Sequence, residues 1–271
     1  MSILVTGAGG LVGRHLVALP GTIGLDRTQL DICDPAAVSR ALDHYSPSVV
    51  INAAAFAHVD GCERDPARAW RVNAGGVDVL AQAAKARRLR LLHLSTDYVL
   101  GGDGLTLSVD AASAPLGVYA RSKWGGEQAA RAAEATIVRL QWVYSSSTSS
   151  SSFVDRAIQR MAAGDSVSLV TDQLGCPTPA ALLAQWLVEL ARLRVLPAIV
   201  HLATTGAATP QQWICALAEA QGITPLWHPI VRADLPGASR PARSCLDVSE
   251  TERLFGRTLP NWHTALRAPI R

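Results

Sequence analysis

The fold is decided by the opening stretch Ile3-Leu4-Val5-Thr6-Gly7-Ala8-Gly9-Gly10-Leu11-Val12-Gly13, in which an apolar run enters a glycine-rich turn. Glycines recur at positions 7, 10 and 13, and the chain continues into a helix-like segment at 14–17. A tight turn needs residues without Cβ, a pyrophosphate needs close approach of the backbone, and a helix N-terminus supplies unpaired N–H groups. The stretch therefore predicts a strand, a turn and a helix that bind a dinucleotide through Gly7, Gly10, Leu11, Val12 and Gly13.

The next apolar run, Ile23-Gly24-Leu25, ends at Asp26, about where the second strand of such a unit ends. A carboxylate at this place accepts hydrogen bonds from the adenosine ribose of NAD, whereas an arginine accommodates the additional phosphate of NADP. Because Arg27 follows Asp26 directly, both residues are candidate cofactor ligands, and the choice between NADH and NADPH stays open.

Composition bounds the class of protein. The chain has 271 residues, of which 49% are hydrophobic, enough for a large core. Its net charge of +3 comes without a lysine-rich run or a basic stripe, so we expect no nucleic-acid partner. The absence of a long apolar stretch and of a signal peptide predicts a soluble, cytoplasmic protein without a membrane partner. The five cysteines lack C-x-x-C spacing, so we expect packed thiols and neither disulfides nor a metal site.

Strand-like apolar runs at 48–51, 91–94 and 136–140 alternate with helix-length segments. This alternation is typical of a parallel sheet, and we predict an α/β fold with a Rossmann-type doubly wound parallel sheet. The dinucleotide-binding domain is expected at 1–150. Residues 151–271 are expected to form mainly a smaller C-terminal substrate-binding lobe, with some elements returning to the main sheet. In this half we expect helices at 153–163 and 179–193 and short apolar runs at 167–170 and 200–203.

Ligands of parallel sheets bind beyond the carboxyl ends of the strands, so the residues after each run are candidates. The run at 48–51 is followed by Asn52 and then by small side chains that would leave the backbone open to a cofactor, those of Ala53, Ala54 and Ala55. The run at 91–94 is followed by Ser95 and Thr96. A hydroxyl on this loop can donate a hydrogen bond to a carbonyl oxygen, and ordinary turn residues are the alternative.

Tyr119 and Lys123 form a second candidate group. Only two of the 25 basic residues are lysines, and one of them stands four positions after one of only four tyrosines. Residues four apart share one face of a helix, so both side chains can reach the same bound molecule. An ammonium close to a phenol favours the phenolate, which would let Tyr119 exchange a proton near neutral pH. The alternative is an ordinary surface pair on a helix.

Taken together, these residues resemble the extended short-chain dehydrogenase/reductases, and more narrowly the dTDP-4-dehydrorhamnose reductase family. The broad resemblance rests on the glycine turn, Asn52-Ala53-Ala54, Ser95-Thr96-Asp97-Tyr98-Val99 and Tyr119-x-x-x-Lys123. The narrower one rests on blocks that occur in the family's order from end to end: Val59-Asp60, Val72-Asn73, Arg139-x-x-Trp142-Val143-Tyr144, Asp172-Gln173-x-Gly175-x-Pro177-Thr178 and Arg240-Pro241-x-x-Ser244-x-Leu246-Asp247.

The resemblance implies reduction, by NADPH or NADH, of the C4 ketone of a dTDP-linked 4-keto-6-deoxy sugar in nucleotide sugar biosynthesis. The first choice of reaction is dTDP-4-dehydro-L-rhamnose to dTDP-L-rhamnose, and another deoxysugar nucleotide is the alternative. It implies that Tyr119 donates the proton, that Lys123 holds the nicotinamide ribose and lowers the tyrosine pKa, and that Thr96 polarises the ketone. The oligomeric state that we consider for the protein is a homodimer.

The resemblance also implies substrate contacts. Val59, Thr96, Tyr98 and Trp142 would line the sugar pocket, since aromatic faces suit the apolar side of a deoxysugar. Arg240 would bind the substrate diphosphate, because guanidinium meets phosphate oxygens with two donors. Trp142 is equally well explained as a core residue, and Arg240 as a solvated surface residue.

Asp31 and Ile32 resemble the pair that flanks the adenine in this family, with the carboxylate toward the amino group and the apolar side chain on the ring. An ordinary helix cap is a comparable explanation. Asp31 or Asp34 would then cap the helix that begins at the following proline.

The sequence departs from the family at two places. The serine run at 145–152, typical of a flexible segment, replaces a short loop beside the expected substrate mouth. Phe56 and His58 stand where tyrosine and a small or polar residue are usual, and we expect His58 to be a surface or packed residue outside the mechanism.

Two other functions are open. One is a dehydratase or epimerase, which is disfavoured because Tyr98 follows Asp97 where a second carboxylate is needed. The other is a non-catalytic regulatory subunit.

Overall fold

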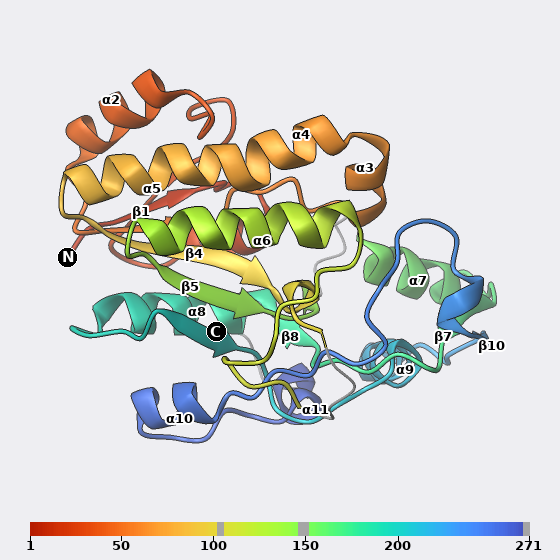
Figure 1. Cartoon of the computed structure of the whole chain (residues 1–271). Coiled ribbons are helices and arrows are strands. Elements are labelled where there is room, and N and C mark those ends of the chain that lie inside the picture. Colours follow the sequence, from red (N-terminus) through yellow and green to blue (C-terminus); the bar gives the residue numbers. More distant parts are fainter. Residues whose placement is uncertain (102–105, 146–151, 268–271) are drawn as a thin grey trace.

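The computed structural model describes residues 1–101, 106–145 and 152–267 (Figure 1). Its strands are β1 (Ile3–Thr6), β2 (Thr22–Leu25), β3 (Val49–Asn52), β4 (Arg90–Thr96), β5 (Thr136–Leu140), β6 (Val143–Tyr144), β7 (Val167–Val170), β8 (Thr178–Pro179), β9 (Ile199–Leu202) and β10 (Trp227–Ile230). Its α-helices are α1 (Leu11–Val17), α2 (Pro35–Tyr45), α3 (Val59–Arg64), α4 (Pro66–Trp70), α5 (Gly76–Ala86), α6 (Gly117–Ala132), α7 (Phe153–Ala162), α8 (Ala180–Arg192), α9 (Pro210–Ala220), α10 (Ser249–Phe255) and α11 (Trp262–Arg267). Shorter turns are the π turn η1 (Arg71–Gly75) and the 3-10 turns η2 (Asp97–Val99) and η3 (Arg232–Asp234).

Six strands form one sheet in the order β2-β1-β3-β4-β5-β9. Every neighbouring pair in this sheet is parallel. The predicted Rossmann-type α/β fold is thereby confirmed. The strand order reverses at β1, whose neighbours are β2 and β3, and ligands of such sheets bind where the order reverses.

Helices cover both faces of this sheet, because side chains alternate between the two faces along each strand. In β1, Ile3 and Val5 pack in one cluster with Leu16 of α1 and Leu187 of α8. Leu4 packs on the opposite face, in a cluster that holds residues of α2, α5 and α6. Figure 1 shows these three helices on one side of the sheet and α8 on the other. Burial on both faces explains why the first strand is an unbroken apolar run.

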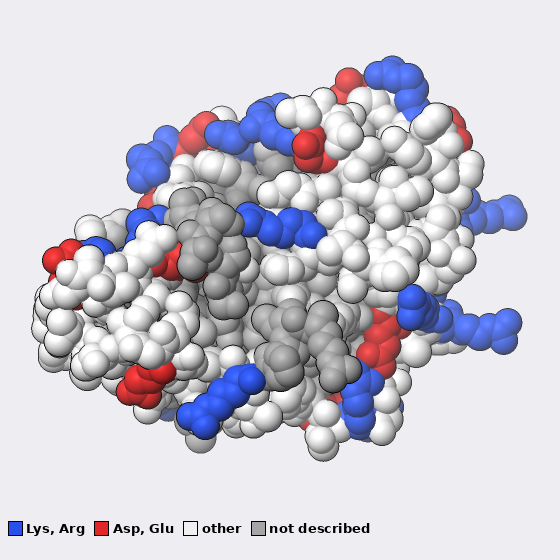
Figure 2. All heavy atoms as spheres, turned by 180° about the vertical axis from the view of Figure 1, so that it is seen from behind, with Lys and Arg blue, Asp and Glu red and all other residues white. Residues whose placement is uncertain are grey.

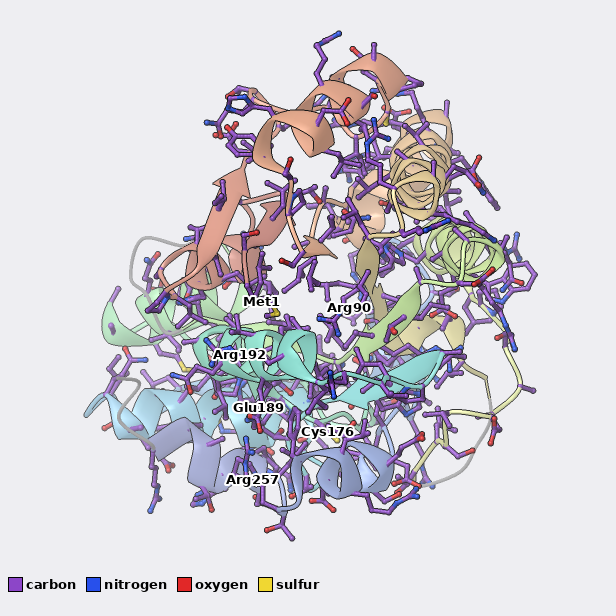
Figure 3. All side chains as sticks on the ribbon, turned by 90° about the vertical axis from the view of Figure 1, so that its left-hand side faces the viewer. Met1, Arg90, Cys176, Glu189, Arg192 and Arg257 are labelled. Carbon is purple, nitrogen blue, oxygen red and sulfur yellow. The ribbon has the colours of Figure 1, made fainter. Side chains whose placement is uncertain are left out.

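Helix α8 is held in its layer by charged side chains that Figure 3 labels. Arg90, at the start of β4, donates to the carbonyl oxygens of Leu193 and Ala191 at the end of the helix, the latter at 2.6 Å. Glu189 accepts from two nitrogens of Arg257 at 2.5 and 2.7 Å. The Arg90 contacts satisfy carbonyl groups that the end of α8 leaves unpaired, and so tie the second half of the chain to the sheet.

The second half of the chain contributes α8 and β9 to the main layers and builds a smaller lobe from other elements. In this lobe β7 pairs with β10 and β6 with β8. Trp213 of α9 packs there with Ile158 of α7 and with Tyr144. Residues 146–151 hold the expected domain boundary and most of the serine run, and both lie outside the described residues.

Charged side chains are spread over the surface. On the face shown in Figure 2, basic and acidic residues lie singly or in mixed groups, and most of the surface between them is uncharged.

Within the described ranges, no helix combines the length and the apolar character that a membrane crossing requires. All five cysteines are free thiols; four of them are buried and Cys33 is half-buried.

Helices α4 and α5 are joined end to end by the π turn η1 (Figure 1). Asn73 lies in this turn and is fully buried. Its Oδ1 accepts from the N–H of Phe56 at 2.8 Å, and its Nδ2 donates to the Phe56 carbonyl at 3.1 Å and to Ser122 Oγ at 3.0 Å. The π turn thereby ties the loop after β3 to helix α6. Such turns are frequent at functional sites.

Helix α6 passes so close to the π turn that a side chain does not fit at position 126. A Cβ on Gly126 would lie 2.1 Å from the carbonyl oxygen of Asn73. We expect Gly126→Ala to destabilise the fold by about 1 to 3 kcal/mol, as overpacking does, and to lower the Tm by roughly 2–4 °C per kcal/mol. Thermal unfolding followed by circular dichroism measures this.

Gly75→Ala is the control, since a Cβ there meets only the Trp70 carbonyl oxygen at 3.9 Å. Alanine is the better helix former by up to about 1 kcal/mol, so this variant should match or exceed the parent Tm. Equal melting temperatures in the two variants would contradict the close approach of α6 to η1.

Candidate active site

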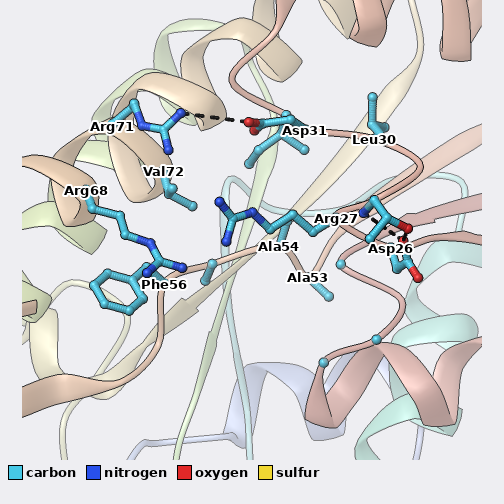
Figure 4. A pocket seen from close by; sticks show the side chains of 16 residues that line it. Asp26, Arg27, Leu30, Asp31, Ala53, Ala54, Phe56, Arg68, Arg71 and Val72 are labelled. Atoms are coloured by element: carbon cyan, nitrogen blue, oxygen red, sulfur yellow. Dashed lines mark hydrogen bonds and ion pairs between the residues drawn. The ribbon is translucent and has the colours of Figure 1, made fainter. Parts of the chain in front are cut away.

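A cavity of about 340 Å³ lies beyond the carboxyl ends of β1, β2 and β3, where the strand order reverses. Figure 4 shows the side chains around it. Nine of the predicted cofactor residues line it: Gly7, Gly10, Asp26, Arg27, Asp31, Ile32, Ala53, Ala54 and Ala55. Five others do not: Leu11, Val12, Gly13, Tyr119 and Lys123.

Two glycines of the opening turn are required because backbone packs against backbone. Gly7 has a φ of +70°, and a Cβ there would lie 2.6 Å from the backbone of Ala54. A Cβ on Gly13 would lie 2.2 Å from the carbonyl oxygen of Gly7. The turn after β1 therefore lies directly against the loop after β3, and both line the same cavity.

The fully buried Asn52 fixes the loop after β3. Its Oδ1 accepts from Thr6 Oγ1 at 2.7 Å and from the N–H of Ala54 at 3.1 Å. Its Nδ2 lies 3.1 Å from Nδ1 of His93 on β4. One amide side chain thus joins the ends of β1 and β3 to the middle of β4.

Asp26 uses one carboxylate oxygen within its own loop. This oxygen accepts from the hydroxyl of Thr28 at 2.6 Å and from the N–H groups of Thr28 and Gln29 at 2.8 and 3.2 Å. These bonds, led by that of the Thr28 hydroxyl, lower the pKa of Asp26. The neighbouring Arg27 extends into the cavity in Figure 4, and no ion pair joins it to any residue that the structure describes.

For Asp31 and Asp34, the sequence left open whether an aspartate caps the helix or faces the cofactor, and the structure gives the two residues different places. Asp34 is the helix cap, because its Oδ1 accepts from the first backbone N–H groups of α2 at 2.9 and 3.1 Å. Asp31 lines the cavity, accepts from the N–H of Cys33 at 3.0 Å and faces the guanidinium of Arg71 at 3.8 Å (Figure 4). Asp31 is therefore placed to meet a ligand.

Sequence reasoning missed Arg68 and Arg71 as cavity residues. The guanidinium of Arg68 lies 4.3 Å above the ring of Phe56, a cation–π contact (Figure 4). The signal was available, since residues three apart share a helix face. His58, as expected, serves the structure: its Nδ1 accepts from the N–H of Gly61 at 2.7 Å and caps α3.

Thr96, Tyr119 and Lys123 converge at the carboxyl end of β4. Thr96 is the last residue of β4, and the other two lie one turn apart on α6. The hydroxyl of Thr96 lies close enough to Tyr119 to lower the pKa of the phenol, against the effect of burial. The buried Lys123 donates from Nζ to the carbonyl oxygen of Leu94 at 2.6 Å.

Burial governs the acid–base properties of this group. It raises the pKa of Tyr119, against a hydrogen bond with Thr96 that acts in the other direction. It lowers the pKa of Lys123 to about 8, against the negative charge of Glu127. The structure differs here from our expectation that Lys123 lowers the tyrosine pKa, since the ammonium is directed to the Leu94 carbonyl. Tyr119 therefore holds its proton at neutral pH, as a proton donor must.

Asp97 is a buried carboxyl beside Thr96 that the sequence did not single out as a site residue. It accepts from Thr96 Oγ1 at 3.1 Å and from Gln141 Nε2 at 3.2 Å. Gln141 in turn donates to the Ser244 carbonyl at 2.6 Å and accepts from the N–H of Cys176 at 2.9 Å. These bonds link Thr96 to segments far along the chain.

Three of the predicted substrate residues, Tyr98, Arg240 and Val59, belong to a series of neighbouring groups that begins at Tyr119. The ring of Tyr98 meets that of Tyr119 edge to face, with centroids 5.9 Å apart. The charge of Arg240 acts on Tyr98, and its guanidinium contacts both carboxylate oxygens of Asp60 at 3.1 Å. Asp60 directly follows Val59 at the start of α3. Arg240 is thus held in an ion pair and is neither free nor fully solvated.

Trp142 lies on the side of the smaller lobe. It is half-buried, has a φ of +39°, and stacks on Trp213 with ring centroids 5.8 Å apart. Gly175 lies so close that a Cβ there would meet the Trp142 ring at 2.4 Å. A positive φ is costly for a bulky side chain and is kept only where the surroundings enforce it. The core and substrate readings both remain compatible with this position.

The whole sequence, residues 1–271, matches the family described as the RmlD substrate binding domain. The chain belongs to this family. A relative from Mycobacterium tuberculosis (strain H37Rv), named dTDP-4-dehydrorhamnose reductase, is 41% identical over 99% of this chain and 92% of that protein. A relative from Streptomyces antibioticus, named a probable dTDP-4,6-dihydroxy-2-methyloxan-3-one 4-ketoreductase, is 35% identical over 98% of this chain and 94% of that protein.

Solved structures place the family on the same fold. The crystal structure of dTDP-4-dehydrorhamnose reductase from Bacillus anthracis in complex with NADP has a TM-score of 0.91 at 26% identity, and covers 98% of both chains. The structure of a dTDP-4-dehydrorhamnose reductase from Clostridium acetobutylicum also has a TM-score of 0.91, at 29% identity. The six-stranded sheet and its lobe are thus the architecture of the RmlD family.

The buried carboxyl of Asp97 should make stability depend on pH. Burial raises its pKa from 3.8 to about 6. Because the folded-state pKa exceeds the unfolded one, the protonated carboxyl stabilises the fold below pH 3.8, and this contribution is lost as the pH rises through about 6. Relative to Asp97→Asn, the parent should lose about 3 kcal/mol of unfolding free energy between roughly pH 4 and pH 7. Urea unfolding at both pH values measures the difference, and parallel curves for the two proteins would refute it.

Proposed function

We propose that the protein is an NADPH-dependent reductase of the C4 ketone of a dTDP-4-keto-6-deoxyhexose. Its first candidate substrate is dTDP-4-dehydro-L-rhamnose, and the product is then dTDP-L-rhamnose. The observation that carries the proposal is the convergence of Thr96, at the end of β4, with Tyr119 and the buried Lys123 of α6, while the glycine-turn cavity lies beyond the ends of neighbouring strands of the same sheet. The names of the M. tuberculosis and B. anthracis relatives support the same reaction.

The cavity fits the adenosine half of such a cofactor. Gly7 and Ala54 line it without large side chains, Asp26 has one carboxylate oxygen outside its own loop bonds, and Arg27 offers a cation to a phosphate. A nicotinamide cofactor supplies the hydride when bound, and the protein aligns and stabilises the reacting groups. The NADP in the B. anthracis structure supports the phosphorylated form as the first choice.

The catalytic residues then divide the work at the ketone oxygen. Tyr119 donates its proton to this oxygen as negative charge develops, and Thr96 stabilises the same charge by a hydrogen bond. Burial raises the pKa of Tyr119, so the phenol keeps its proton until the oxygen gains charge. Lys123 would hold the nicotinamide ribose through its ammonium group.

Two other functions are less well supported. A 4,6-dehydratase needs two neighbouring carboxylates after the threonine, and here Tyr98 follows Asp97. A regulatory subunit would not need Thr96, Tyr119 and Lys123 side by side. The cytoplasmic location and the homodimer stay predictions from the sequence.

The identity of the sugar is the most specific part of the proposal. Tyr98 contacts Tyr119 and is near Arg240, whereas Trp142 lies against Gly175 on the side of the smaller lobe, and a sugar nucleotide would lie between these two groups. The name of the S. antibioticus relative makes another dTDP-linked 4-keto sugar the second candidate substrate. Loss of NADPH absorbance with a panel of such sugars distinguishes these substrates, and no oxidation with any of them would overturn the reductase.

Tyr119→Phe should lower kcat by about a hundredfold to ten-thousandfold, because a positioned proton donor contributes that much. The NADPH oxidation assay with dTDP-4-dehydro-L-rhamnose measures it. Tyr45→Phe is the matched control, since Tyr45 ends α2, away from the site, and should leave the rate unchanged. A Tyr119→Phe enzyme as fast as the Tyr45→Phe enzyme would remove Tyr119 from the mechanism.

Arg27→Ala should weaken NADPH binding by about tenfold or more, because a hydrogen-bonded ion pair with a phosphate contributes about 1.5 to 3 kcal/mol. NADH binding should change little. Isothermal titration calorimetry with both cofactors measures the ratio. Arg71→Ala is the control in the same cavity, because Arg71 already faces Asp31 at 3.8 Å. Equal losses for NADPH and NADH in Arg27→Ala would contradict a phosphate contact.

A further inference from the structure

A buried ion pair lies beneath the catalytic turn of α6. Glu127 follows Tyr119 and Lys123 at the same helical spacing, so all three share one face of the helix. Its two carboxylate oxygens accept from Nε and Nη2 of Arg139 on β5 at 3.0 and 2.9 Å. The two side chains are 2% and 4% exposed. Arg139 belongs to the family motif Arg139-x-x-Trp142-Val143-Tyr144, whereas Glu127 belongs to none of the motifs that carry the resemblance.

Stability alone is a weak reason for such a pair. Replacing a buried ion pair by apolar side chains of similar volume is often neutral or stabilising, because both charges lose their hydration. Among the residues that the structure describes, Arg139 forms an ion pair with Glu127 alone: its Nη1 donates to the Val109 carbonyl at 3.1 Å and lies 3.5 Å from His201 Nε2. Burial lowers the pKa of His201 to about 4, so this ring is neutral. The carboxylate of Glu127 calls for another explanation.

Lys123 supplies that explanation, because its charge is buried and needs an anion. Three elements bring titratable groups to it: Cys62 on α3, His93 on β4 and Glu127 on its own helix. Burial raises the pKa of the Cys62 thiol to about 11 and lowers the pKa of His93 well below its ordinary value. Both are neutral at physiological pH.

The remaining charged neighbours act elsewhere. Asp97 is bonded to Thr96 and Gln141 and acts on Tyr119, and Tyr119 keeps its proton. Arg139 is the partner of Glu127. Among the described residues, Glu127 is therefore the one anion that acts on Lys123.

We propose that Glu127 is a positioning residue: its carboxylate, held in place by Arg139, keeps the Lys123 ammonium charged and directed to the site above it. This inference rests on the proposed reductase function, in which a charged Lys123 binds the nicotinamide ribose. Without Glu127, a lysine buried among neutral groups loses its proton at a lower pH, because burial disfavours the charged form.

The chain offers a direct measurement, because it has only two lysines. Protein labelled with [ε-¹³C, ζ-¹⁵N]lysine gives two sets of side-chain NMR signals, and their shifts report each titration midpoint. Lys85 is the internal reference: its side chain is 44% exposed and pairs with Glu134 at 2.8 Å. This titration needs neither substrate nor turnover, so it can fail while the reductase assay succeeds, and the reverse.

Glu127→Gln should lower the Lys123 midpoint by about 1 to 3 pH units, the usual effect of losing an opposite charge nearby, and leave Lys85 unchanged. Glu127→Leu combined with Arg139→Met should lower it too, and this double variant should keep the site folded because it removes both members of the ion pair and leaves neither of them buried without its partner. Arg139→Gln removes the partner but keeps the carboxylate, so the midpoint should not fall. A Lys123 midpoint that is the same in the parent and in both Glu127 variants would overturn the proposal.

The pH profile of the enzyme gives the second readout. In both Glu127 variants, the alkaline limb of kcat/KM should move to lower pH together with the Lys123 midpoint, and activity at lower pH should be largely kept. A role in folding alone would scale the whole profile down without moving the limb. A displaced midpoint with an unmoved limb would refute the link between the charge on Lys123 and turnover.

Discussion

The burial of one ammonium group, that of Lys123, is the constraint on which the site depends. A charge in the protein interior is costly unless hydrogen bonds and opposite charge compensate it. The carbonyl of Leu94 and the carboxylate of Glu127 provide both. Helix α6 must therefore lie close against β4 and β5, and Gly126 permits the close approach on its other side. Tyr119, one turn before the ammonium, is thereby brought to Thr96.

The fold separates cofactor binding from proton transfer and then joins them through one buried side chain. The cavity is formed where the backbone of β1 and β3 meets, and the acid–base residues lie at β4 and α6. The side chain of Asn73 connects the two parts. It is hydrogen-bonded to Phe56, in the loop after β3 that lines the cavity, and to Ser122 of α6. One fully buried amide is thus hydrogen-bonded to both parts of the site.

Local patterns predicted the parts of the structure that depend on nearby residues. The apolar runs and the glycine spacing fixed the sheet and its switch point, and the four-residue spacing of Tyr119 and Lys123 placed both on one helix face. The remainder depends on tertiary burial and long-range contacts. The upward pKa shift of Tyr119 and the pairing of Arg240 with Asp60 across the chain have no local signature. The spacing of Arg68 and Arg71 places them on one helix face, but whether that face lines the cavity depends on how α4 packs.

The π turn η1 also limits which changes of chain length this protein can tolerate. A π turn holds one residue more than an α-helical turn, and each residue of a helix advances the side chain by about 100°. Deleting a single residue between 71 and 75 would therefore rotate α4 against α5 and swing Arg68 away from Phe56. The number of residues in this segment is therefore constrained by the geometry of the helix, whatever side chains the segment carries.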